Sequence, residues 1–132
     1  MLFRSPFLIS STLLGVMAQR LVRRICSKCK TPFEPSESQL QQMSLSPHDL
    51  GDKSFFYGRG CPNCSDTGYR GRKGIYELLV ISDAVRNLIN ERAPTVVLRQ
   101  KAIEYGMVTL REDGLRSVYQ GETTVEEILK YT

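Results

Sequence analysis

Two short stretches, CSKC at Cys26–Cys29 and CPNC at Cys61–Cys64, carry the strongest structural signal in this sequence. They contain all four cysteines of the chain, and 31 residues separate the two pairs. A spacing of two residues lets the chain turn tightly, so that both sulfurs of a pair reach one ion at about 2.3 Å. Two such turns complete a tetrahedral site of four thiolates, which favours Zn²⁺, with iron as the lesser option. The sequence therefore predicts a structural metal site with four ligands, Cys26, Cys29, Cys61 and Cys64.

Other uses of these cysteines fit the pattern less well. A redox C-x-x-C motif does not need two copies, and the βαβ context of such motifs is absent. Disulfides within adjacent pairs are poor structural links in a reducing cytosol. His48, the only histidine, falls between the two pairs. We expect it to be a surface residue, because four sulfurs already satisfy zinc.

Charge is strongly segmented along the 132 residues, although the net formal charge is only +4. Residues 1–30 carry six bases and no acid, residues 31–52 four acids and no base, and residues 53–74 five bases and one acid. Each basic segment contains one cysteine pair, so its cations can offset the negative charge of a Zn²⁺–tetrathiolate cluster. The alternative is a free-standing zinc ribbon that binds nucleic acid, although few aromatic residues accompany the basic ones.

Composition and length exclude several classes of protein. Hydrophobic residues make up 41% of the chain and charged residues 24%, so most of it can fold. No uncharged stretch reaches the ~20 residues that a membrane-spanning helix needs. The sequence also has no nucleophile–base pair, paired-carboxylate site or phosphate-binding loop. We therefore expect neither a transmembrane protein nor a self-contained large enzyme.

The first 25 residues are predicted to form one strand and one helix. The apolar run Phe7–Ile9 is typical of a short strand. The triplet Ser10–Thr12 can cap a helix that begins near Thr12, because apolar residues then recur at helical spacing as far as Leu21. A secretory signal peptide is the alternative, since Arg4 precedes the apolar run.

Short elements are also predicted between and after the cysteine pairs. Ser36 and Gln39 have the spacing of a capping box for a short helix. The runs Phe55–Tyr57 and Ile75–Leu79 are apolar, and we expect them to pair as a small sheet beside the metal.

Four short amphipathic helices are predicted in residues 82–132. Each has a candidate capping residue, and these are Ser82, Thr95, Thr109 and Thr124. Pro94 ends the first helix, and Gly106 and Gly121 end the second and third. Because the apolar residues of these helices fall on one face, we expect them to form a compact bundle.

Several motifs together resemble the C-terminal part of the assembly ATPases of type II secretion and type IV pilus biogenesis. They are LGVMAQRLVRRIC at residues 14–26, the paired cysteines, GYRGR at 68–72, GIYEL at 74–78, GMVTL at 106–110 and the segment 113–128. The resemblance covers essentially residues 6–132.

This resemblance implies an α+β fold in three parts. Residues 1–25 would be the last strand and helix of a RecA-like α/β core, residues 26–81 a four-cysteine zinc-binding module with a small sheet, and residues 82–132 a helical C-terminal subdomain. Family members are cytoplasmic, act at the inner membrane and form hexameric rings. They hydrolyse ATP to drive the assembly of a pilus or pseudopilus through an inner-membrane platform protein. By this resemblance the partners are other ATPase subunits and the platform protein, and we do not expect nucleic acid to be one.

Two details of the resemblance concern particular residues. Gln19, Arg20 and Arg23 are candidates for contacts with a neighbouring subunit, with a solvated or capping face as the alternative. The family's phosphate-binding loop, G-x-x-x-x-G-K-[S/T], does not occur in this sequence. Without its N–H donors and Mg²⁺ ligand, phosphoryl transfer has no positioning. We therefore expect structural zinc in this chain, ATP and Mg²⁺ only in a full-length parent protein, and no catalytic residues or ATP hydrolysis here.

Overall fold

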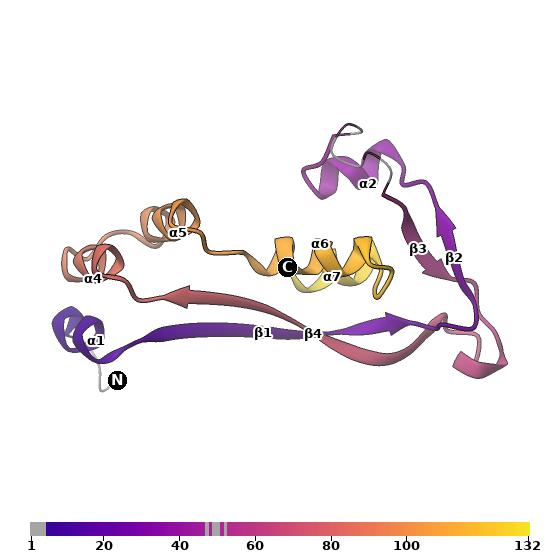
Figure 1. The fold of residues 1–132 in the computed structure, drawn as a ribbon, viewed down its shortest axis with the longest axis horizontal. Helices are drawn as coiled ribbons and strands as arrows, with labels where there is room; N and C mark the ends of the chain where they lie inside the picture. The colour runs from indigo at the N-terminus through magenta and orange to yellow at the C-terminus, as the bar shows by residue number, and fades with distance from the viewer. Residues whose placement is uncertain (1–4, 47, 49–50, 52) are drawn as a thin grey trace. The chain divides into compact units, whose positions relative to one another are not determined.

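The structure is a computed structural model that describes residues 5–46, 48, 51 and 53–132 (Figure 1). The chain forms two compact units, each built from two separate segments. The first unit consists of Met1–Ala18 and Tyr76–Thr109, and the second of Gln19–Ile75 and Leu110–Thr132. Within the described part of the chain, no helix has both the length and the apolar character needed to cross a membrane.

Two long strands contribute residues to both units. β1 (Gly15–Ile25) and β4 (Tyr69–Val80) are hydrogen-bonded neighbours in a two-stranded sheet. Figure 1 shows that they run in opposite directions. The fold is therefore α+β. Residues 26–68 connect the two strands, which are not joined by a tight turn.

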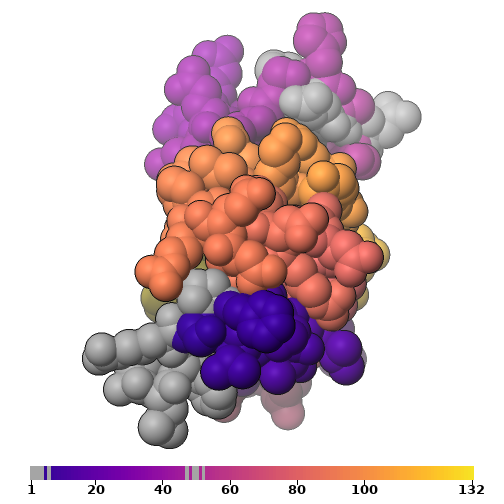
Figure 2. Space-filling model, turned by 90° about the vertical axis from the view of Figure 1, so that its left-hand side faces the viewer, coloured from indigo at the N-terminus to yellow at the C-terminus, as the bar shows by residue number. Residues whose placement is uncertain are grey.

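The first unit contains α1 (Pro6–Thr12), α4 (Asp83–Asn90) and α5 (Thr95–Glu104). The side chain of Ser82 caps α4 by accepting a hydrogen bond from the Val85 amide at 3.4 Å. Helix α1 packs against α4, and Figure 2 shows the two in direct contact. The Ser10 hydroxyl donates to Asn90 Oδ1 at 2.8 Å, and Arg86 Nε donates to the Ser10 carbonyl oxygen at 2.8 Å.

The order of elements at the N-terminal side of this unit is the reverse of the predicted one. Residues 7–9, predicted as a strand, lie in α1, and the helix predicted from Thr12 is replaced by β1. The helix begins earlier because the Ser5 side chain accepts from the Leu8 amide and a proline occupies the start of the first turn. Leu14 and Met17, which the helical spacing placed on a buried face, are 82% and 61% exposed.

A second two-stranded sheet lies in the second unit. β2 (Lys30–Phe33) pairs antiparallel with β3 (Phe55–Gly58), and the register places Lys30 opposite Gly58 and Phe33 opposite Phe55. The predicted pairing of residues 55–57 with 75–79 is therefore wrong, because residues 75–79 belong to β4 and pair with β1. Pro32 concealed β2 in the sequence, and a two-stranded sheet tolerates a proline since both of its strands are edges.

The core of the second unit is formed by residues of β1, β3 and β4 together with three helices, α2 (Glu37–Gln42), α6 (Leu110–Tyr119) and α7 (Val125–Tyr131). The capping box of Ser36 and Gln39 is confirmed at the start of α2. The buried apolar residues are Val22, Leu40, Met43, Phe55, Ile75, Val118, Val125 and Ile128. Helices α6 and α7 approach closely at Gly114, where an added Cβ atom would lie only 2.6 Å from Ile128 Cδ1.

All four helices predicted for residues 82–132 are present, but they do not share one unit. Helices α4 and α5 belong to the first unit, and α6 and α7 to the second. The predicted helix-ending glycines have positive φ, 101° at Gly106 and 76° at Gly121, as expected of residues that follow a helix C-terminus. Local signals thus located the helices correctly, whereas their grouping differs from the single bundle that was expected.

Candidate metal centre

The four cysteines lie in two tight turns of the second unit. Cys26 follows the end of β1, and the Cys29 amide donates to the Cys26 carbonyl oxygen at 3.3 Å. In the second pair, Cys61 precedes the short 3-10 helix η1 (Pro62–Cys64) and Cys64 ends it, and the Cys64 amide donates to the Cys61 carbonyl oxygen at 3.2 Å. Each turn therefore holds its two sulfurs on the same side of the backbone.

The four sulfur atoms are close enough to bind one ion. The distance is 3.7 Å between the Sγ atoms of Cys26 and Cys61, and 3.8 Å both between those of Cys29 and Cys64 and between those of Cys61 and Cys64. All four lie within 4.8 Å of one another, and none forms a disulfide. Sulfurs at the corners of a tetrahedron with Zn–S bonds of about 2.3 Å lie about 3.8 Å apart. The cluster is therefore compatible with a metal site formed by the predicted ligands.

Hydrogen-bond donors point at two of the sulfurs. Asn63 Nδ2 donates to Cys26 Sγ at 3.3 Å. The Gly68 amide donates to Cys64 Sγ at 3.2 Å, and the Cys61 amide donates to the same sulfur at 3.4 Å. Such donors orient metal-bound thiolates and stabilise their negative charge.

These contacts shift the thiol pKa values in different directions. The hydrogen bond from Asn63 lowers the pKa of Cys26 to about 6. Burial opposes ionisation of Cys64, but the amides of Gly68 and Cys61 outweigh it and lower that pKa. Burial raises the pKa of Cys29 to about 11. Protons would therefore compete less with a metal ion for Cys26 than for Cys29.

Arg70 places Asn63 in this arrangement. Its Nη1 atom donates to the Asn63 backbone oxygen at 2.6 Å and to Asn63 Oδ1 at 3.1 Å. The amide NH₂ group of Asn63 is thereby left to face Cys26. Sequence reasoning predicted a basic surrounding for the cysteines but not Asn63, whose position inside the second C-x-x-C pair was the available signal.

The backbone joins the two halves of the cluster. The Cys26 amide donates to the Gly68 carbonyl oxygen at 3.0 Å, and the Arg59 amide donates to the Cys29 carbonyl oxygen at 3.2 Å. Gly58 and Gly68 touch through their backbones, since a Cβ atom at Gly58 would lie far inside contact distance of the Gly68 carbonyl. Glycine is required at both positions because the two backbone segments approach so closely.

The other residues singled out from the sequence lie outside this cluster. His48 is exposed and does not belong to the group of candidate ligands. Gln19 and Arg20 are exposed on β1. Arg23 is half-exposed and is held by contacts within the chain: its side chain pairs with Glu127 at 2.9 Å and lies over the ring of Tyr69 at 4.0 Å.

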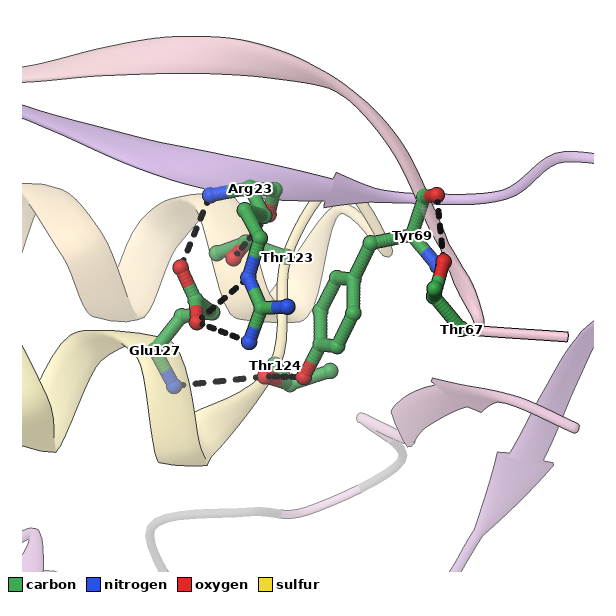
Figure 3. A network of polar contacts seen from close by, with 6 residues as sticks. All are labelled: Arg23, Thr67, Tyr69, Thr123, Thr124 and Glu127. Carbon is green, nitrogen blue, oxygen red and sulfur yellow. Dashed lines mark hydrogen bonds and ion pairs between the residues drawn. The ribbon is translucent and has the colours of Figure 1, made fainter. Parts of the chain in front are cut away.

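Glu127, which the sequence placed only in a capping box with Thr124, is a buried acid whose partner sequence reasoning missed. Figure 3 shows it facing Arg23, with Tyr69, Thr123 and Thr124 around the pair. No local pattern indicates this network, because Arg23 and Glu127 are separated by 104 positions.

Comparison with known proteins identifies the class. The family described as type II/IV secretion system protein matches residues 1–130. The chain is 43% identical over 127 residues to a protein named type IV pilus assembly ATPase PilB from Thermus thermophilus. It is 42% identical over 127 residues to a type II secretion system protein E from Pseudomonas aeruginosa. The chain therefore belongs to the type II/IV secretion system protein family, and the resemblance stated from its motifs is confirmed.

These alignments cover most of this chain and a small part of the relatives. They include 96% of the chain, but only 14% of the Thermus protein and 25% of the Pseudomonas protein. A pilus assembly ATPase PilB from Myxococcus xanthus, 40% identical, is covered to 23%. The chain thus spans a quarter or less of the length of these three relatives.

Proposed function

We propose that this chain supplies a zinc-stabilised module to an ATPase that powers type II secretion or type IV pilus assembly. The observation that carries the proposal is the cluster of four sulfurs, all within 4.8 Å of one another and with three of their spacings at 3.7–3.8 Å, in a chain that belongs to this family. Zinc would be held by Cys26, Cys29, Cys61 and Cys64. It would crosslink the two turns and, with four protein ligands, leave no open position for catalysis.

The proposed organisation follows the family. Residues 1–25 would end a RecA-like core, residues 26–81 would carry the metal module, and residues 82–132 would supply the C-terminal helices, which divide between the two units. Gln19, Arg20 and Arg23 would contribute to contacts between subunits of a hexamer. The protein would work in the cytoplasm, against the inner membrane, with a platform protein as its membrane partner. The exposure of Gln19 and Arg20 supports a contact role, because both remain accessible to another chain.

Metal content is the direct test of the module. We expect the purified chain, isolated anaerobically, to carry one zinc ion by elemental analysis, and the Cys64→Ser variant to carry much less. The exposed Ser65→Ala variant, which alters the neighbouring residue but no sulfur, is the matched control and should keep its zinc. A wild-type chain with no stoichiometric zinc or iron would refute the proposal.

Nucleotide turnover tests whether this chain can hydrolyse ATP without the rest of an ATPase. We expect no ATP hydrolysis by this chain alone, because its sequence has no phosphate-binding loop. Release of phosphate that rises with protein concentration and exceeds a boiled control would contradict this. The nucleic-acid alternative is not favoured, since the relatives above are named as secretion and pilus proteins.

A further inference from the structure

The outer edge of β1 is closed by the connection between α6 and α7. The Ile25 amide donates to the Glu122 carbonyl oxygen at 3.0 Å. The Thr123 hydroxyl donates to the Arg23 carbonyl oxygen at 2.8 Å. The Arg23 amide donates to Glu127 Oε2 at 2.8 Å, so a side-chain carboxylate takes the place of a neighbouring strand. The end of β1 is thus tied to the beginning of α7.

Glu127 is held more firmly than a surface ion pair. Its side chain is 2% exposed, and Oε1 accepts from Arg23 Nε at 3.0 Å and from Arg23 Nη2 at 2.9 Å. Together with the backbone amide, one carboxylate therefore receives three hydrogen bonds from a single residue (Figure 3). Such charge-assisted, bidentate contacts are strong and fix the geometry of both partners.

A second contact ties β4 to the same end of α7. The hydroxyls of Tyr69 and Thr124 are hydrogen-bonded at 2.9 Å. Thr124 also caps α7, since its hydroxyl accepts from the Glu127 amide at 3.3 Å. Thr67 steadies Tyr69 from the other side, where its hydroxyl donates to the Tyr69 carbonyl oxygen at 3.0 Å (Figure 3).

Both tied strands lead directly to the sulfurs. Along β1, Arg23 is followed by Arg24, Ile25 and then Cys26. Along β4, Tyr69 follows Gly68, whose amide donates to Cys64 Sγ and whose carbonyl oxygen accepts from the Cys26 amide. A short segment therefore links each cysteine pair to a residue that is hydrogen-bonded to α7 or to its cap.

We propose that these contacts form a latch, made of Arg23, Tyr69, Thr123, Thr124 and Glu127, that couples the docking of α7 to the binding of metal by the cysteines. The inference rests on the metal site of the proposed function. Glu127 acts as a positioning residue: it touches no sulfur, but it fixes the strand that delivers Cys26. Because coupling is reciprocal, a bound metal should hold α7 in place, and a docked α7 should strengthen metal binding.

The first experiment compares two charge-removing substitutions on adjacent residues of α7. Glu127→Gln removes the buried partner of Arg23 but keeps the shape of the side chain. Glu126→Gln removes the same charge from an exposed neighbour and is the control. Zinc affinity is measured by competition with a chromogenic chelator. We expect Glu127→Gln to weaken zinc binding about tenfold, as loss of outer contacts does at other metal sites, and Glu126→Gln to change it less than twofold.

A spectroscopic measurement separates positioning from general stability. Co²⁺ bound to four thiolates has visible bands that report the geometry of the site. We expect these bands to shift or broaden in Glu127→Gln and to match the wild type in Glu126→Gln. Tyr69→Phe, which leaves no buried charge unpaired, should weaken zinc binding in the same direction by a smaller factor, and it decides the matter if Glu127→Gln fails to fold.

The reciprocal experiment follows α7 by hydrogen exchange. We expect the amides of residues 125–131 to exchange at least tenfold faster after zinc is removed from the wild-type chain. The latch is refuted if exchange in α7 is independent of zinc, or if Glu127→Gln and Glu126→Gln bind zinc with equal affinity. A wild-type chain that binds no zinc would refute the proposed function as well, and metal analysis distinguishes that outcome from failure of the latch alone.

Discussion

The two units bury very different amounts of apolar surface. Among the described residues, 15 apolar side chains are buried, and the first unit holds only Ile81, Val85 and Ala102. Of the 16 large apolar side chains that stay exposed, 13 belong to the first unit, with Leu14 the most exposed at 82%. The second unit has its own apolar core and the cysteine cluster, whereas the first depends on helix caps and local contacts. The same chain thus contains one unit with an apolar core and one with little interior.

This contrast predicts that metal removal acts on one unit only. Chelation of the zinc-loaded chain should destabilise the second unit by several kcal/mol, because the binding free energy of a structural metal is folding free energy. Hydrogen exchange resolved by segment is the measurement. We expect β2 and β3 to lose protection, while α4 keeps the protection it had before. Equal loss in both units would abolish the contrast.

Truncating one apolar side chain in each unit should also lower the free energy of unfolding unequally, by less than metal removal does. Phe55 is fully buried in the second unit, and Phe55→Ala should lower the free energy of unfolding by about 3–5 kcal/mol. Val96 is 69% exposed in the first unit, and Val96→Ala should change the free energy by less than about 0.5 kcal/mol. Denaturant unfolding of the zinc-loaded variants measures both. Similar effects at the two positions would show that exposure does not distinguish the units.

The smallest expected effect concerns the caps on which the first unit relies. Ser82 caps α4 through its side chain, so Ser82→Ala should lower stability by about 1 kcal/mol and speed exchange in α4. Thr95 was predicted to cap α5, but it is the first residue of that helix, and Pro94 occupies the cap position without a side-chain hydrogen bond. Thr95→Ala should therefore be nearly neutral. A loss as large as that of Ser82→Ala would place the cap at Thr95 after all.

The sequence predicted best what depends on neighbouring residues. The capping box at Ser36 and Gln39 and the four helices after Ser82 rely on signals within one or two helical turns. The convergence of the cysteines was also predictable, because each C-x-x-C turn places two sulfurs side by side and a tetrahedral site of four thiolates needs two such pairs.

Features set by distant partners could not be predicted in this way. The apolar residues around Leu14 and Met17 fit a helical spacing, and only pairing with β4 makes that segment a strand. Glu127 belongs to a capping-box pattern in the sequence, yet its carboxylate binds Arg23, 104 positions away. A local sequence pattern does not show whether such a carboxylate caps its own helix or binds a residue far along the chain.

The register of β2 and β3 also determines how the long loop between the cysteine pairs can vary. The loop leaves and returns through a ladder that ends with Phe33 opposite Phe55, on the side away from the sulfurs. Chain added beyond that ladder lengthens a closed loop and raises its entropic cost only slowly. Gly51 is exposed and lies in this stretch, and no atom of the described residues would lie within 4 Å of a Cβ atom added there. A guest domain or fluorescent reporter could therefore be inserted there while the geometry of the four thiolates is retained.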